Sequence, residues 1–208
     1  MPYSLEEKAK RFACDAHAQA KQRRKYTNAP YIVHPGAVAE LVRTVRADET
    51  MLAAAWLHDT LEDTPTTRHQ LQQLFGHEVA LLVEMLTNPP CRSQDRVQRT
   101  QSYLQHTAKA SPSAQTIKIA DIIDNTRDIV DNDPEFAPVY LVEKQLQLRL
   151  LRHGDPALWQ QADQQIRQAI LRLSAPPFNV PASWFRHRAS QYLTARDAGT
   201  LSEQRERR

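Results

Sequence analysis

Apolar residues recur along the chain with the three- to four-residue spacing of amphipathic helices, and no segment sustains the two-residue alternation of a strand. Ser4 and Glu7, and later Thr67 and Gln70, have the spacing of a capping box, and Asp48 can cap the helix that follows it. The pattern therefore predicts an all-α fold of about eight to ten helices, at about residues 5–20, 35–45, 51–61, 67–76, 79–86, 95–108, 113–130, 139–151, 157–173 and 184–195.

The chain has 208 residues, which suits one compact domain with an appendage. Pro176 and Pro177 interrupt the helical pattern. We expect one domain over residues 1–175 and a C-terminal extension over residues 176–208. The extension is expected to hold one helix, over residues 184–195, and a polar end that frays.

The net charge of +3 comes entirely from the end of the chain, where six basic and three acidic residues follow Trp184. The rest of the chain is neutral overall, so a broad nucleic-acid-binding surface is not expected. A local basic run, Lys21, Arg23, Arg24 and Lys25, is on charge alone typical of a solvated helix end.

The longest apolar stretches, such as Met51–Leu57, are far shorter than the ~20 residues of a membrane span, and the N-terminus lacks a signal-peptide pattern. Cys14 and Cys91 show no metal-type spacing, and four glycines against thirteen prolines argue against a glycine-rich phosphate loop. These features predict a cytoplasmic protein that binds neither membranes nor nucleic acids, and they leave open whether it forms a homo-oligomer.

Candidate chemistry begins with His58 and Asp59, which end an otherwise apolar helical run. Burying an imidazole and a carboxylate together is costly unless a metal or a hydrogen-bond partner satisfies them. Glu62 follows His58 by four residues, and Asp63 follows Asp59 by four. A continuous helix would therefore place these two carboxylates one turn further along the same face.

Further polar residues interrupt two other predicted helices. Asp121 lies in an apolar window, with Lys118 three residues before it and Asn125 four after it, and His34 lies at a loop-to-helix junction. Each of these features alone is common as a capped or ion-paired group. Two imidazoles and two carboxylates together would suit a divalent metal that keeps water ligands, and Mn²⁺ is one reasonable choice among several.

The compound pattern, His, then His-Asp-x-x-Glu-Asp, then Ala-Asp-x-x-x-Asn, resembles the hydrolase domain of the RelA/SpoT alarmone enzymes. This domain is a branch of the HD superfamily, and the chain is most similar to its stand-alone small alarmone hydrolases. The matching stretches cover about residues 5–150 and are Gln22-Arg-Arg-Lys, Pro30-Tyr-Ile-Val-His-Pro, Leu57-His-Asp-Thr-Leu-Glu-Asp-Thr, Phe75-Gly and Ile117-Lys-Ile-Ala-Asp-Ile-Ile-Asp-Asn-Thr-Arg.

The resemblance implies an HD-type helical bundle with a single Mn²⁺ and a pair of catalytic carboxylates. The implied metal ligands are His34, His58, Asp59 and Asp121, and the residues implied to position and activate the attacking water are Glu62 and Asp63. The segment after residue 175 is too short for the synthetase domain of the long family members, so alarmone synthesis is not expected.

The resemblance also implies a nucleotide site. In it, Arg24 would stack on the purine, Lys25 would line the pocket, Asn125 would contact the nucleoside, and Lys118 would lie near a phosphate. The implied reaction removes the 3′-pyrophosphate of guanosine tetra- or pentaphosphate, (p)ppGpp, and releases pyrophosphate with GDP or GTP.

The sequence departs from the usual family pattern at several places. The segment from Arg24 to His34 has no glycine and is one residue longer, Trp56 replaces a smaller aliphatic residue, and Ile122-Ile-Asp-Asn-Thr-Arg replaces a Leu-x-Asn-Leu-Arg pattern. None of these changes removes an implied ligand or catalytic residue. They leave the base preference open, because related stand-alone hydrolases accept adenosine alarmones, (p)ppApp, or NADPH.

Three classes of function are compatible with these residues. The first is the 3′-pyrophosphohydrolase, the second is a metal-dependent phosphatase of the same superfamily with another nucleotide substrate, and the third is a non-catalytic nucleotide-binding regulator. The second class would share every metal ligand and differ at Arg24 and Lys25. Intact Glu62 and Asp63 argue against the third, because a binding protein has little need for a water-activating pair.

Overall fold

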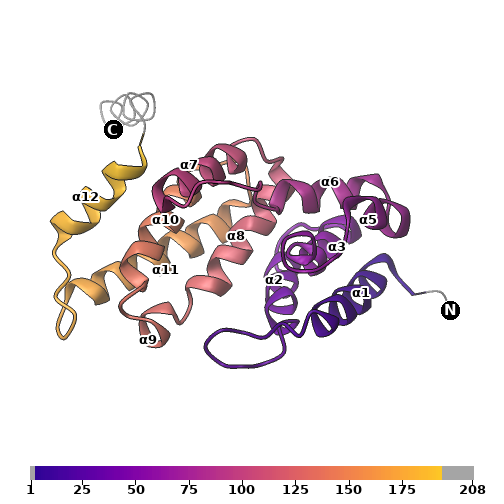
Figure 1. Ribbon diagram of the computed structural model, residues 1–208, viewed down its shortest axis with the longest axis horizontal. Coiled ribbons are helices and arrows are strands. Elements are labelled where there is room, and N and C mark those ends of the chain that lie inside the picture. Colours follow the sequence, from indigo (N-terminus) through magenta and orange to yellow (C-terminus); the bar gives the residue numbers. More distant parts are fainter. Residues whose placement is uncertain (1–2, 194–208) are drawn as a thin grey trace.

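The computed structural model describes residues 3–193, and in this part of the chain it contains helices but no β-strand (Figure 1). Ten helices have eight or more residues, and α4 and α9 are single turns of four. The predicted all-α class is therefore confirmed. The bounds are α1 Leu5–Gln19, α2 Val33–Arg43, α3 Glu49–Leu57, α4 Thr60–Asp63, α5 Arg68–Phe75, α6 His77–Leu86, α7 Arg96–Thr107, α8 Pro112–Thr126, α9 Ile129–Asn132, α10 Ala137–Leu150, α11 Pro156–Ser174 and α12 Ala182–Tyr192.

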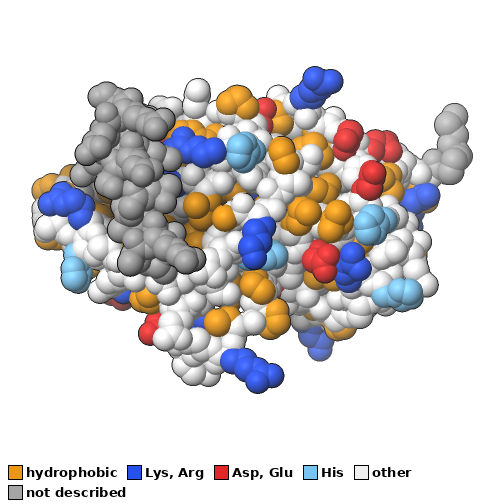
Figure 2. Space-filling view, turned by 90° about the horizontal axis from the view of Figure 1, so that it is seen from above, with side chains coloured by type: hydrophobic (Ala, Val, Ile, Leu, Met, Phe, Trp, Pro, Cys, Tyr) orange, Lys and Arg blue, Asp and Glu red, His pale blue; other side chains and the backbone are white. Residues whose placement is uncertain are grey.

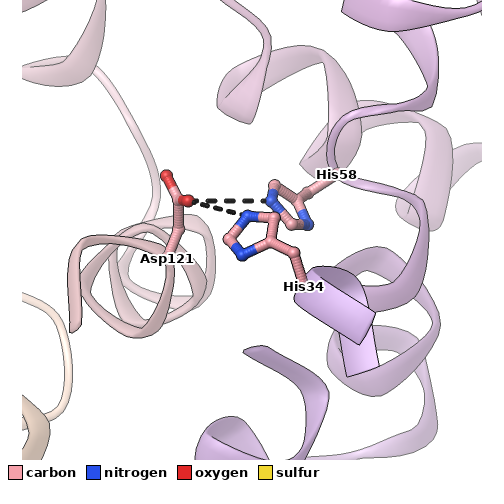
Figure 3. Close-up of side chains that lie close together, drawn as sticks. All are labelled: His34, His58 and Asp121. Carbon is pink, nitrogen blue, oxygen red and sulfur yellow. Dashed lines mark ion pairs between the residues drawn. The ribbon is translucent and has the colours of Figure 1, made fainter. Parts of the chain in front are cut away.

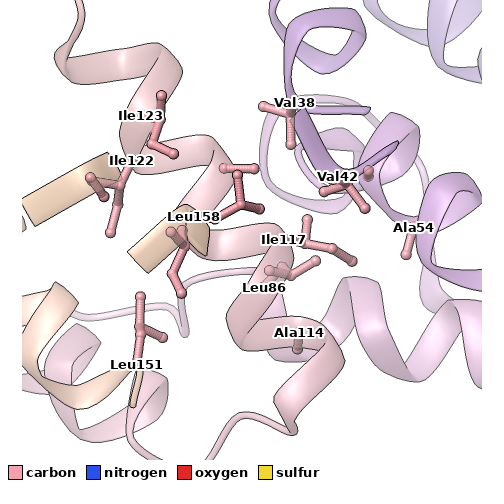
Figure 4. Packing of buried hydrophobic residues seen from close by; sticks show 14 of the residues in the cluster. Val38, Val42, Ala54, Leu86, Ala114, Ile117, Ile122, Ile123, Leu151 and Leu158 are labelled. Carbon is pink, nitrogen blue, oxygen red and sulfur yellow. The ribbon is translucent and has the colours of Figure 1, made fainter. Parts of the chain in front are cut away.

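Helix α8 is the central element of the bundle. It lies between the N-terminal helices, where it packs on α2, α3 and α6, and the C-terminal helices α10 and α11 (Figure 1). Its isoleucines fill the space on both sides, with the fully buried Ile117 on the side of Val42 of α2 and the fully buried Ile122 on the side of Leu158 of α11 (Figure 4). Burial of apolar surface on two sides holds α8 in place, and with it the polar residues that it carries.

Side-chain caps start the helices where the sequence predicts them. Both predicted capping boxes are present, at Ser4 with Glu7 and at Thr67 with Gln70, and Asp48 accepts a hydrogen bond from the Met51 backbone N–H. One start differs from the prediction. Helix α2 begins two residues before Pro35, which still lies in the first turn, where a missing N–H costs no intrahelical bond.

The predicted helix over residues 51–61 is in fact two helices. Helix α3 ends at Leu57, and α4 begins at Thr60. Side chains form hydrogen bonds to two carbonyls of the last turn of α3. His58 Nδ1 bonds the Ala55 carbonyl at 2.8 Å, and the Thr60 hydroxyl donates to the Leu57 carbonyl at 2.7 Å. The break therefore falls at His58 and Asp59, so the assumption of one continuous helix through Glu62 and Asp63 was wrong.

The predicted helix over residues 113–130 is also divided, into α8 and α9. The side-chain amide of Gln165, on α11, donates to the Ile123 carbonyl and to the Thr126 hydroxyl, both at 2.7 Å. Carbonyls at a helix end need partners outside the helix. This contact from α11 supplies one and fixes where α8 ends.

The C-terminal extension packs on the body through α12, which contacts α7 and α10. Phe185 and Tyr192 are buried, and the Tyr192 hydroxyl donates to Glu143 at 2.6 Å. Arg96 binds the same carboxylate through two hydrogen bonds of 2.7 Å. The predicted helix over residues 184–195 is confirmed as α12, while its last two predicted residues and the predicted polar end lie outside the described residues.

Trp56, one of the departures from the family pattern, lies in the core between α1 and α2. Its indole N–H donates to Glu6 at 3.0 Å. On the other side the ring faces Gly36, where an added Cβ would lie 3.1 Å from the indole. Because α2 has a glycine at this point, the large ring fits without displacing α2 from the site.

None of the helices in residues 3–193 combines the length and the apolar content that crossing a bilayer requires. On the face shown in Figure 2, Lys and Arg side chains are dispersed among neutral and hydrophobic ones instead of forming a continuous patch. This distribution agrees with the neutral body inferred from the sequence.

Candidate active site

Three side chains from three helices converge at the centre of the bundle: His34 of α2, His58 at the end of α3 and Asp121 of α8 (Figure 3). All three are buried, and one potential ligand atom from each lies within 4.8 Å of the others. Asp121 Oδ1 lies 3.2 Å from His34 Nε2 and 3.8 Å from His58 Nε2. The predicted convergence of these three residues is therefore present in the fold.

Hydrogen bonds fix how the two imidazoles are turned. His58 Nδ1 faces the Ala55 carbonyl, and His34 Nδ1 faces the Asp124 carboxylate at 2.7 Å, so Nδ1 is the donor in both rings. Both Nε2 atoms point to the centre, are buried and have no hydrogen-bond partner. Two buried Nε2 atoms that face carboxylate oxygens fit a divalent cation, which would take the place of any proton on these nitrogens, since metal-bound histidines commonly donate their other N–H in this way.

Asp59, the fourth predicted ligand, lies at the edge of this cluster. Its Oδ2 is 3.2 Å from His58 Nε2 and 3.5 Å from His34 Nε2. The same oxygen accepts a 2.6 Å hydrogen bond from the Tyr31 hydroxyl. Asp59 is outside the compact group of three, and its carboxylate is close enough to both rings to complete a mixed nitrogen and oxygen set.

Electrostatic interactions in the cluster shift several pKa values. Burial lowers the pKa of His34, but the carboxylates of Asp121 and Asp124 outweigh it and raise the pKa to about 9. Burial raises the pKa of Asp121, whereas Lys118, with Nζ 2.8 Å from Asp121 Oδ2, brings it well below its ordinary value. Asp121 therefore stays ionised, and a cation at the centre would meet a negatively charged oxygen.

The two predicted catalytic carboxylates have different partners. Glu62 accepts hydrogen bonds from the backbone and side-chain amides of Asn88, at 3.2 and 3.3 Å. Asp63 accepts one from the Gln22 side-chain amide at 2.8 Å, and the Gln22 carbonyl in turn bonds His17 Nδ1 at 2.6 Å. Both carboxylates are thus held in place from outside α4, each from a different side of the site.

Arg24 and Lys25, two of the predicted substrate contacts, lie in the loop between α1 and α2. Arg24 donates to Asn125 Oδ1 at 3.3 Å and lies 3.5 Å from Asp124, so it faces the C-terminal end of α8. Lys25 is more exposed and pairs with Asp133 at 2.9 Å. The structure brings Arg24 and Asn125 together beside Asp121, and places Lys25 at the outer rim.

The arrangement can support metal-assisted hydrolysis. Two imidazoles and two carboxylates could hold one divalent ion. Glu62 and Asp63 lie on α4, which begins two residues after His58. Arg24 and Lys118 add positive charge on either side of Asp121, where a phosphorylated substrate would need it.

Comparison with known proteins agrees with this geometry. The sequence model of the family described as HD domain matches residues 9–168. The chain belongs to the HD domain family. Its solved relatives include a metazoan ortholog of SpoT described as hydrolysing ppGpp and playing a role in starvation responses, with a TM-score of 0.72, 31% identity, and coverage of 81% of this chain and 97% of that one.

Several relatives of this HD domain are named as pyrophosphohydrolases. The guanosine-3′,5′-bis(diphosphate) 3′-pyrophosphohydrolase MESH1 of Xenopus tropicalis is 34% identical over 129 residues, which is 61% of this chain and 70% of that protein. A probable guanosine-3′,5′-bis(diphosphate) 3′-pyrophosphohydrolase of Synechocystis is 51% identical over 86 residues, which span 41% of this chain and 11% of that longer protein. The predicted relationship to RelA/SpoT-type hydrolases is confirmed.

Four residues that hold the site residues of this HD domain in place have no role predicted from the sequence. Tyr31 bonds Asp59, Asp124 bonds His34, Gln22 bonds Asp63 and Asn88 bonds Glu62. Asp124 could have been inferred, since it lies three residues from Asp121 on the same helix face. The position of Asn88 in the sequence does not predict its contact with Glu62, because the two residues are 26 positions apart and meet only through the packing of α6.

Proposed function

We propose that this HD domain is a Mn²⁺-dependent hydrolase that removes the 3′-pyrophosphate of (p)ppGpp and yields pyrophosphate with GDP or GTP. One observation carries the proposal: two buried imidazole Nε2 atoms without hydrogen-bond partners face carboxylates. Helix α4, which carries Glu62 and Asp63, begins two residues after His58. The activity named for the relatives supports the choice of substrate.

The ion would be held by His34, His58, Asp59 and Asp121. When bound, a divalent cation supplies Lewis acidity to water and to phosphoryl oxygens. Mn²⁺ suits a mixed set of imidazole and carboxylate ligands with coordination positions left for water.

Glu62 and Asp63 would position the attacking water and accept its proton. The water oxygen forms a bond to the phosphorus next to the 3′ oxygen, while the bond between that phosphorus and the 3′ oxygen breaks. The 3′ oxygen takes up a proton and becomes the hydroxyl of the released nucleotide. Asn88 and Gln22 hold the two carboxylates in position throughout.

The nucleoside would lie at the C-terminal end of α8. There the planar guanidinium of Arg24 can stack on the purine, and Asn125 can bond the nucleoside. Lys25 at the rim and Lys118 next to Asp121 would offset the charge of the phosphates.

A second substrate class would use the same metal ligands and carboxylates but differ in its contacts to the nucleotide and, for NADPH, in the phosphate group that is removed. Hydrolysis of adenosine alarmones, (p)ppApp, or of NADPH is the alternative, because the loop from Arg24 to His34 departs from the usual family pattern at the position where the purine would bind.

Product analysis tests the proposal. Purified protein with Mn²⁺ is incubated with 3′-pyrophosphorylated guanosine and adenosine nucleotides and with NADPH, and we expect GDP or GTP and pyrophosphate from the guanosine substrates. The Arg24→Lys variant should raise KM with a smaller effect on kcat, since lysine keeps the charge but loses the plane. Turnover of NADPH or adenosine substrates alone would contradict the guanosine assignment, and no turnover of any of them would contradict the hydrolase.

A further inference from the structure

A small cavity of about 60 Å³ lies beside the site and contains two lysines that the metal centre does not require. Lys118 of α8 and Lys144 of α10 line it, together with Asn88, Tyr103 and Gln147. The cavity is too small for a nucleoside and large enough for a small polyatomic ion, because one water needs only ~10–15 Å³ measured in this way.

The cavity adjoins the proposed reaction centre through two of its lining residues. Asn88 donates both of its amide groups to Glu62, and Lys118 Nζ lies 2.8 Å from Asp121 Oδ2. Two residues that line the cavity therefore contact a proposed catalytic carboxylate and a proposed metal ligand.

The charges around the cavity leave one cation without an anionic partner. Glu143 also lines it, but Arg96 and the Tyr192 hydroxyl already bind that carboxylate. Lys118 pairs with Asp121, whereas Lys144 has no carboxylate oxygen within 4.0 Å among residues 3–193. Its ammonium donates to the Gln147 side-chain carbonyl at 3.1 Å and lies 5.2 Å from the centre of the Tyr140 ring, and neither partner carries a negative charge. An ammonium in this setting is costly unless an anion joins it.

The pKa of Lys144 also reflects the lack of an anionic partner. Burial lowers the pKa of the Lys144 amine, and the nearby charge of Lys118 lowers this pKa further. An anion placed between the two lysines would relieve both effects.

The direction of α8 indicates which part of the substrate would reach the cavity. Lys118, Asp121 and Asn125 are three and four residues apart and so lie along one face of the helix, over about 10 Å. Asn125, with Arg24, is at the nucleoside end of this line. Lys118, with Lys144, is at the other end, beyond the reacting phosphorus near Asp121.

We propose that Lys144, together with Lys118, binds the outer phosphoryl group of the 3′-pyrophosphate, and so holds the leaving pyrophosphate in the cavity. The inference rests on the proposed function, because it takes the substrate from that function. It adds Lys144 as a substrate-binding residue and assigns it to the phosphoryl group that is farther from the 3′ oxygen.

Binding of inorganic pyrophosphate and of GDP to the Mn²⁺-loaded protein, measured by calorimetry at a fixed free Mn²⁺ concentration, tests the proposal. Lys144→Met should raise the Kd for pyrophosphate by about tenfold or more, the size expected for a lost hydrogen bond to a charged group. The Kd for GDP should not change. The matched control is Lys8→Met, which removes a lysine from the exposed face of α1 and should affect neither ligand.

Three results would overturn the proposal. The first is an equal Kd for pyrophosphate in the wild type and in Lys144→Met, or no binding to the wild type, which would mean that the cavity holds water only. The second is a selective loss of GDP affinity, which would assign Lys144 to the 5′-diphosphate. The third is a lowered Tm in both Lys144→Met and Lys144→Gln, which would give Lys144 a structural role; we expect the Tm to stay equal or rise, because both variants remove a buried charge.

The proposed function can fail independently of this inference. If the wild type turns over no alarmone but binds pyrophosphate through Lys144, the anion site stands and the reaction does not. If the wild type hydrolyses (p)ppGpp and Lys144→Met leaves pyrophosphate binding unchanged, the reaction stands and the role of Lys144 does not.

Discussion

Glu62 and Asp63 are adjacent in the sequence but held by different parts of the fold. Asn88, after α6, binds Glu62, and Gln22, after α1, binds Asp63. Each carboxylate accepts its hydrogen bonds from neutral amide groups. The proposed water-activating pair thus depends on two loops that are far apart in the chain.

Replacing either carboxylate by its amide tests their role. In Glu62→Gln and Asp63→Asn the new carbonyl oxygen can still accept from Asn88 or Gln22, so the geometry should persist while the proton acceptor is lost. We expect hydrolysis to slow by roughly 10²–10⁴-fold, with bound metal retained. Steady-state kinetics together with elemental analysis measure both quantities.

The matched control for this pair is Glu40→Gln, which changes a carboxylate with an exposed side chain on α2 and should leave the rate unchanged. Turnover near the wild-type rate in both site variants would show that neither carboxylate takes up the proton.

The environment of His17 predicts that the free energy of unfolding depends on pH. Burial lowers the pKa of this histidine, so the folded protein holds it neutral where the unfolded chain takes up a proton. Its contribution to the free energy of unfolding is therefore complete above the unfolded pKa of about 6.5 and is lost as the pH falls through the lower folded pKa.

Denaturant unfolding of the wild type and His17→Gln at several pH values checks this expectation. Other titrating groups are common to both proteins, so they cancel in the difference between the two unfolding free energies. That difference should shrink as the solution becomes more acidic than about pH 6.5. A difference that stays constant with pH would mean that His17 is not held neutral.

At the scale of elements, the sequence predicts where helices begin better than where they end. Starts at Ser4, Asp48 and Thr67 depend on a cap within three residues, which is local information. The break at His58 and the end of α8 depend on hydrogen bonds from His58 and from Gln165 of α11. Apolar periodicity continues through both breaks, so the pattern does not reveal them. The first is made by local side-chain bonds of His58 and Thr60, and the second by a tertiary contact from α11.

Helix α12 shows how an element outside the matched family region is attached. The family match ends at residue 168, and α12 is held to the body by Tyr192, whose hydroxyl bonds Glu143. We propose that the boundary near residue 175 separates the hydrolase domain from an extension that docks on α7 and α10.

Tyr192→Phe should lower the free energy of unfolding by about 1.5–3 kcal/mol, since it removes a buried hydrogen bond to a charged group. Arg96 still binds Glu143, so the carboxylate is not left without partners. The control is Tyr3→Phe, at a side chain that is 55% exposed. Equal stability of Tyr192→Phe and the wild type in denaturant unfolding would exclude a stabilising role for this contact.

At the scale of the whole molecule, the site exists because α8 is packed between two groups of helices. His34 and His58 come from the N-terminal group, and Asp121 comes from α8, which α10 and α11 hold from the other side. The family resemblance carried by these three residues and their neighbours predicted that they meet, and they converge in the fold. Lys144 was not predicted, because its place beside Lys118 follows from how α10 packs on α8 and not from any motif.

The central claim is that His34, His58, Asp59 and Asp121 hold one divalent ion. Elemental analysis of the purified wild type, His58→Ala and Asp59→Ala, with circular dichroism as the check on folding, tests it most directly. The account predicts about one metal ion per chain in the wild type and none in either variant, with helical content largely retained, because each variant removes one of the four proposed ligands. Full metal occupancy in both variants would contradict it.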